Sequence, residues 1–61
     1  MVIIKASKEN IKCIYRKLYE VTNFSFNIET RIVKIKPKDW LLYGDRIVNA
    51  INNIEHEIVI E

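Results

Sequence analysis

The chain has 61 residues, of which ten are Lys or Arg and eight are Asp or Glu, so its net charge is only +2. A chain this short forms at most one domain, residues 1–61, and hides only about 60% of the surface that its unfolded form exposes. The single cysteine, Cys13, excludes an internal disulfide framework and a cysteine-rich metal site within one chain. A lone thiol is typical of a reducing compartment, so we expect a cytoplasmic protein.

The first predicted element is a strand over residues 2–6, in which Val2 and Ile4 alternate with Ile3 and Lys5. The three apolar residues that precede the first lysine are too few for a signal peptide or a membrane span. We therefore expect no interaction with a membrane.

A helix is predicted over residues 8–22. Ser7 offers a hydroxyl for its N-cap, and Glu9 places an acid in its first turn, where the helix dipole favours one. Asn23 stands where a left-handed C-cap would end it. The apolar stripe of this helix consists of Ile11, Ile14, Tyr15, Leu18 and Val21.

The segment FSFNIETRIVKIK, residues 24–36, changes the parity of its apolar positions midway. If Thr30 and Arg31 form the loop of a hairpin, Phe26 faces Ile35 and Ile28 faces Val33, and these four residues share one side of the sheet. This predicts strands over residues 24–29 and 32–36. A two-residue loop prefers Asn-Gly or a similar pair, and Thr-Arg is not one, so a looser loop or a single bulged strand stays open.

The strongest periodicity predicts a second helix over residues 38–54, entered through Pro37. Leu42 points away from its stripe, toward solvent. Gly44 costs about 1 kcal/mol relative to alanine inside a helix, which indicates a close approach there, by a partner or by the chain's own sheet. A last strand is predicted over residues 57–61. The stripe of the helix comprises Trp40, Leu41, Gly44, Ile47, Val48, Ile51 and Ile54.

The element order strand, helix, strand, strand, helix, strand predicts an α+β fold. It is the order of the ferredoxin-like βαββαβ sandwich, in which two helices cover one face of an antiparallel sheet.

No arrangement of residues in the chain is typical of a catalytic or cofactor site. There is no Gly-x-Gly-x-x-Gly, no Gly-Lys-[Ser/Thr] and no Ser/His/Asp set. His56 is the only histidine, and no base accompanies Cys13 on its helix. We therefore predict a protein that is not an enzyme and has no cofactor, no metal and no small-molecule substrate.

Two kinds of partner remain open. The uncovered face of the predicted sheet carries Lys5, Lys34 and Lys36, which could hold RNA phosphates. Sheets that read RNA bases add aromatic stacking platforms, and both phenylalanines belong to the helix side, so nucleic-acid binding is the alternative rather than the main hypothesis.

The main hypothesis is a small protein-interaction module, a homodimer or one subunit paired with a like-folded partner, because apolar residues are left outside the predicted core. Two surfaces could serve. The residues assigned to them are Trp40, Leu42, Tyr43 and Gly44 on the second helix, and Ile3, Ile32 and Val59 on the sheet.

Residues 1–54 resemble the small dimerising subunit of the KEOPS complex, the tRNA threonylcarbamoyl-adenosine machinery. SKENIKCIYRKL is similar to that family's first helix, with Ser7 and Glu9 opening it and Ile14 and Tyr15 following. RIVKIKPKDW resembles its last hairpin strand and the entry to its second helix. IVNAI is similar to the core of that helix, with Asn49 in the Asn position.

The chain departs from this family at three places: Asn52 and Asn53 stand where the family has Arg and Trp, Arg46 is only approximately placed, and the final strand is extra. The resemblance implies a non-catalytic subunit that pairs helix to helix with a like fold and supports a kinase-like catalytic partner in tRNA modification.

Overall fold

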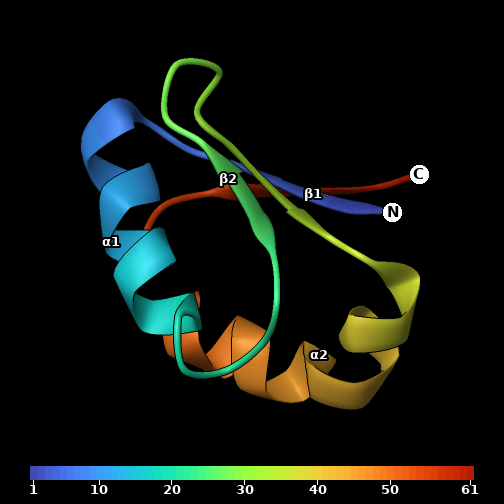
Figure 1. Ribbon diagram of the computed structural model, residues 1–61. Coiled ribbons are helices and arrows are strands. Elements are labelled where there is room, and N and C mark those ends of the chain that lie inside the picture. Colours follow the sequence, from blue (N-terminus) through green and yellow to red (C-terminus); the bar gives the residue numbers. More distant parts are fainter.

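In the computed structural model, which describes all 61 residues, two helices lie against a four-stranded antiparallel sheet (Figure 1). The strand order is β2-β3-β1-β4, so β1 and β3 occupy the centre and β2 and β4 the edges. The predicted α+β class, with two helices and an antiparallel sheet, is confirmed. The elements are β1 (Val2–Lys5), α1 (Lys8–Leu18), β2 (Ser25–Asn27), β3 (Ile32–Ile35), α2 (Pro37–Ile51) and β4 (Glu57–Ile60).

The central strand β1 pairs with both β3 and β4, and its alternation decides which residues are buried. Ile4 lies opposite Val33 on β3 and Ile58 on β4. The two ends of the chain continue this pairing: the Glu61 amide donates to the Met1 carbonyl oxygen at 3.0 Å. The N- and C-termini therefore lie side by side, as Figure 1 shows.

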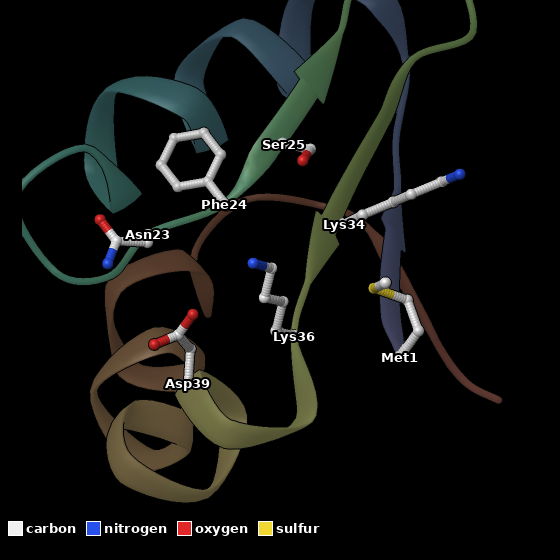
Figure 2. Close-up of a pocket in the computed structure, with 7 residues that line it drawn as sticks. All are labelled: Met1, Asn23, Phe24, Ser25, Lys34, Lys36 and Asp39. Atoms are coloured by element: carbon white, nitrogen blue, oxygen red, sulfur yellow. The ribbon is translucent and has the colours of Figure 1, made fainter.

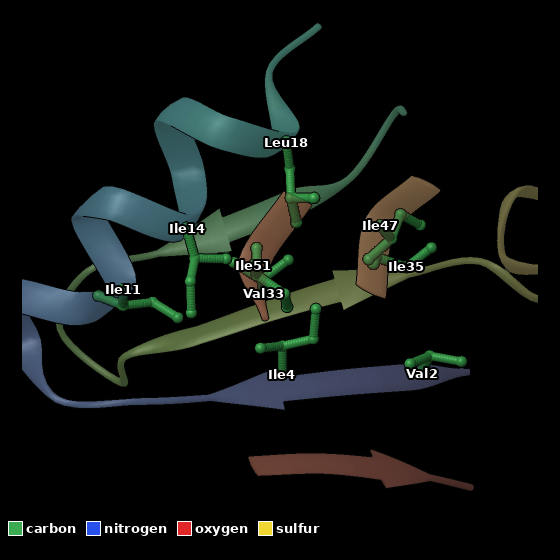
Figure 3. Close-up of a cluster of buried hydrophobic side chains, with 9 residues drawn as sticks. All are labelled: Val2, Ile4, Ile11, Ile14, Leu18, Val33, Ile35, Ile47 and Ile51. Atoms are coloured by element: carbon green, nitrogen blue, oxygen red, sulfur yellow. The ribbon is translucent and has the colours of Figure 1, made fainter. Parts of the chain in front are cut away.

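One hydrophobic core fills the space between the helices and the sheet (Figure 3). Both helices contribute to it, so both cover the same face of the sheet, as predicted. Every fully buried residue is aliphatic, and no polar side chain is buried with them. The core consists of Val2, Ile4, Ile11, Ile14, Leu18, Val33, Ile35, Ile47 and Ile51.

Helix α1 begins as predicted and ends earlier. The Ser7 hydroxyl oxygen accepts a hydrogen bond from the Asn10 amide at 3.1 Å, which caps the first turn. The helix stops at Leu18, whose carbonyl oxygen accepts from both Val21 and Thr22, so the prediction that it runs to residue 22 is wrong. The early turn lets the chain double back and bring Phe24 to 5.5 Å from the Tyr15 ring.

The hairpin between β2 and β3 is present, and its predicted two-residue loop is wrong. Phe26 pairs with Val33 rather than Ile35, and residues 28–31 form the loop. The Asn27 side-chain oxygen accepts from the amides of Glu29 and Thr30 at 2.9 and 3.2 Å, which turns the chain directly after β2. The register differs by two residues, so each side chain keeps its predicted face.

The remaining boundaries lie within three residues of the predicted ones, and β1, β3 and β4 start where predicted. Helix α2 starts at Pro37 rather than residue 38 and ends at Ile51 rather than residue 54. Neither helix has the length and apolar character needed to cross a membrane.

Candidate interaction surface

Helix α2 presents apolar side chains on two sides, only one of which faces the sheet. Ile47 and Ile51 are fully buried, and Trp40 packs partly against the core. Successive residues of a helix are rotated by about 100°, so Leu41 and Val48 lie well to one side of this inner row. They are 85% and 42% exposed, and their predicted place in the buried stripe is therefore wrong.

The exposed apolar residues form a line along the helix. Pro37, Leu41, Gly44 and Val48 follow one another at intervals of four, three and four residues, so they lie one above the other on one side of α2. Leu42 lies beside this line and is 64% exposed, as its spacing predicts. We use the term outer face of α2 for Pro37, Lys38, Leu41, Leu42, Gly44, Asp45 and Val48.

The outer face is hollowed in its middle. An open hollow of about 250 Å³ lies around Gly44, because glycine has no side chain to fill it. The residues that line it are Trp40, Leu41, Leu42, Gly44, Asp45 and Val48. In Figure 1, α2 forms the lower border of the molecule.

Gly44 is not needed for packing within the chain. A Cβ atom built at this position meets only the Trp40 ring of the same helix, at 3.7 Å, which is an ordinary van der Waals contact. Its φ angle is not in the left-handed region either. The explanation that Gly44 lets the helix approach its own sheet is therefore wrong, and the helix-propensity cost of this glycine has no compensation inside the chain.

The other residues predicted for a helix interface point elsewhere. Tyr43 is half-buried and lies next to the turn after α1, where it lines a hollow together with Tyr19 and Val21. Trp40 spans the inner row and the hollow at Gly44. Only Leu42 and Gly44, of the four predicted residues, belong fully to the outer face.

The open face of the sheet is less apolar than the outer face of α2. Ile3, Ile32 and Val59 are half-buried within the sheet rather than exposed. Ile3 lies between Lys34 and Val59 in the pairing. The Lys34 side chain therefore borders Ile3 and Val59 and reduces the apolar surface that a partner could cover.

The predicted lysine cluster divides into two parts. Lys34 and Lys36 line a hollow of about 350 Å³, and Figure 2 shows Asn23, Ser25 and the Asp39 carboxylate around it. Lys34 also lines a neighbouring hollow that contains Asn27. The remaining cluster residue, Lys5, lies in a separate hollow with two acids.

That separate hollow lies at the β4 side of the sheet, across from β2. Glu57 faces Lys5 in the pairing of β1 with β4, and Glu55 and His56 complete the lining. The Asn10 side chain donates to the Glu55 carbonyl oxygen at 3.2 Å, which ties α1 to the segment between α2 and β4. No three potential metal ligands come together here or elsewhere in the chain.

Comparison of the chain with protein-family models, with curated protein sequences and with solved structures found no match.

Proposed function

We propose that this protein is a non-catalytic protein-interaction module whose partner covers the outer face of α2. The observation that carries the proposal is the exposure of two adjacent leucines, 85% for Leu41 and 64% for Leu42, on a helix whose other side is buried. Contiguous exposed apolar surface of this kind marks interaction sites, and Leu side chains exposed in water cost free energy until they are covered.

We further infer that the architecture is the ferredoxin-like sandwich. The βαββαβ element order and the central position of β1 and β3 support this. With the resemblance to the KEOPS subunit, it favours a role as a like-folded, dimerising subunit, with tRNA-modification machinery as the setting. The exposed free thiol of Cys13 supports a reducing compartment, the cytoplasm.

The proposed function predicts that Leu41→Glu releases the chain from its native assembly. In extracts of cells that express the chain, the wild type should elute from a sizing column well above its 7.3 kDa mass, and the variant near it. The partner is then identified by mass spectrometry and the complex rebuilt from purified proteins, because only a rebuilt complex supports the proposal. A charge placed inside an apolar contact is costly unless it is paired.

The matched control is Ile60→Glu, since Ile60 is also aliphatic and 68% exposed but lies on β4. It should leave the assembly intact. A wild-type chain that elutes as a single 7.3 kDa species, or an equal effect of both substitutions, would contradict the proposal.

One observation favours a second candidate function, the binding of single-stranded nucleic acid. Lys34 and Ser25 line both hollows at the β2 side of the sheet, so the two hollows adjoin along one edge. Lysines beside short polar side chains can contact phosphates, and Asn23 and Asn27 add amide donors. At one end of this edge, the negative charge of the Asp39 carboxylate repels the phosphates of a nucleic acid.

If nucleic acid binds at this edge, replacing Lys34 and Lys36 by alanine should weaken binding of a short single-stranded RNA and flatten its salt dependence. Each lost phosphate contact lowers the slope of log K against log salt by about 0.7 for a single strand. Fluorescence anisotropy at several salt concentrations measures this. Replacing Lys5, which lies beside acids, is the control and should change little. RNA binding that is absent, or insensitive to salt, rules this candidate out.

A further inference from the structure

We propose that the free edge of β4 binds an extended segment of another protein, with residues in the order basic, aliphatic, any residue, aliphatic, basic. The segment adds one more strand to the four-stranded sheet. In this mode of recognition, main-chain hydrogen bonds supply the affinity and alternate side chains supply the specificity. The site lies on the sheet, so the proposal goes beyond the outer face of α2 and does not depend on it.

The backbone of β4 has unpaired groups along its outer edge. The Glu61 amide donates to the Met1 carbonyl oxygen at 3.0 Å, and the Met1 amino group donates to the Glu61 carbonyl oxygen at 3.1 Å. Bonded and unbonded pairs alternate along an antiparallel ladder, so Val59 also bonds to β1, whereas Ile58 and Ile60 do not. The amide and carbonyl groups of Ile58 and Ile60 therefore point away from the sheet, where a new strand can bind them.

The edge at β4 is more accessible to a new strand than the edge at β2. By the same alternation, Ser25 and Asn27 bond to β3, so within β2 only Phe26 directs its backbone groups outward. Strand β2 has three residues, and a very short edge strand is one way to avoid pairing with other chains. Strand β4 keeps an unbroken register with β1 and contains no proline, lysine or bulge that would block its edge.

The charges on β4 select a basic partner. Glu57 and Glu61 are both exposed, and they lie on the open face of the sheet on either side of Val59. Opposite charges that face each other across a strand pair stabilise it, and like charges destabilise it. A second β4, paired antiparallel about Val59, would set Glu57 opposite Glu61. A strand with lysine or arginine at both of these positions gains two favourable pairs instead.

The other side of β4 calls for aliphatic residues. Ile58 packs partly against the core, and Ile60 is 68% exposed at the border of the helix layer, where an aliphatic side chain of a new strand would cover it. Strand β1 already has this order of residues on the inner side of β4. It places Lys5 opposite Glu57, Ile4 opposite Ile58 and Val2 opposite Ile60. The proposed segment repeats the chemistry of β1 at the outer edge.

A nuclear magnetic resonance titration of the purified, ¹⁵N-labelled full chain tests the proposal. The probe is the capped peptide Lys-Ile-Thr-Ile-Lys, which reads the same in both directions. The largest shift changes should fall on the amides of Ile58 and Ile60, because these exchange water for a peptide carbonyl group. One short strand makes less than a standard interface, so we expect a dissociation constant of about 0.1–1 mM.

Two matched peptides separate the contributions of charge and backbone. Glu-Ile-Thr-Ile-Glu should bind about tenfold more weakly, because it turns two attractive pairs into repulsive ones. A Lys-Ile-Thr-Ile-Lys peptide that is N-methylated at both isoleucines keeps its charges and loses the donors that face β4. It should show no saturable binding, since the main-chain bonds supply the affinity.

Variants of the chain place the site. Ile60→Pro removes an amide that the fold itself does not use, and proline is tolerated on an edge strand where the amide faces solvent. It should weaken binding about tenfold, whereas Ile60→Ala, which keeps the amide, should stay within about threefold of the wild type. Leu41→Glu should bind the peptide like the wild type, because the outer face of α2 is not involved. Circular dichroism checks that each variant folds.

Each outcome supports or overturns one part of the proposal. Equal binding of the lysine and glutamate peptides overturns the basic partner, and equal binding of the N-methylated peptide overturns strand addition. Shift changes that gather on α2 or β2 overturn β4 as the site, as does binding that is absent at several millimolar peptide. If Ile60→Pro does not fold, the N-methylated peptide decides. A loss of peptide binding in a folded Leu41→Glu variant would show that the two surfaces are not separate.

Discussion

Replacing Ile4 by alanine should unfold a large part of the population, because it removes about 2–5 kcal/mol of stability. A domain of this size has only about 3–9 kcal/mol in total. Ile4 is fully buried on the central strand β1, between Val33 and Ile58, and lies beneath both helices (Figure 3). In urea, the unfolding midpoint followed by the fluorescence of Trp40 should fall by about 2–5 M for a slope near 1 kcal/mol per M.

Ile60→Ala is the matched control for this substitution. Ile60 lies on the same side of the sheet, opposite Val2, but on the edge strand β4, where 68% of its side chain is exposed. Its truncation should cost well under 1 kcal/mol, since most of the removed surface already contacts water. Equal losses for Ile4→Ala and Ile60→Ala would contradict the placement of the core under α1 and α2. These measurements are made at concentrations where the chain is monomeric.

The elements themselves could be predicted because their periodicity is strong and unambiguous. In α1, Ile11, Ile14 and Leu18 recur at helical spacing, and all three are fully buried. The alternation of β1 likewise predicted that Val2 and Ile4 face the core. Such patterns depend only on the geometry of a helix or a strand, so a single sequence contains them.

The register of the hairpin could not be predicted in the same way. Alternation determines which face a side chain occupies, and it is unchanged when a strand slides by two residues. The actual register depends on a local hydrogen-bond pattern at Asn27 and on Arg31, whose φ of 58° is uncommon for a residue other than glycine. Neither signal is visible in the periodicity, so the periodicity alone predicts a two-residue loop of Thr30 and Arg31.

The sequence predicts the exposure of Leu42, but for a related reason it places Leu41 and Val48 of the outer face in the buried stripe instead. Apolar residues extend without a break over about 120° of this helix, from Ile47 round to Leu41, so the pattern does not decide where the buried side ends. Packing against the sheet decides it, because the sheet covers only the row that contains Ile47 and Ile51. The sequence did contain one signal, Gly44, whose cost indicated that another backbone or side chain approaches there.

Phe26→Ala should destabilise the chain by about 2 kcal/mol, because a half-buried aromatic ring is lost from two sets of contacts. Its ring lies 4.7 Å from that of Tyr15 on α1, and its backbone pairs with Val33 on β3. The substitution therefore loosens the attachment of the edge strand β2 to both the helix layer and the sheet. Urea unfolding of the variant measures the loss.

Tyr19→Ala is the control for Phe26→Ala, and nuclear Overhauser contacts test the register on which the argument depends. The Tyr19 ring is also near Tyr15, at 5.9 Å between ring centres, but it is 68% exposed, so its removal should cost under 1 kcal/mol. Cross-strand backbone contacts should join Phe26 to Val33, and none should join Ile28 to Val33. Contacts between Ile28 and Val33, with little loss for Phe26→Ala, would instead mean that the loop consists of Thr30 and Arg31 alone.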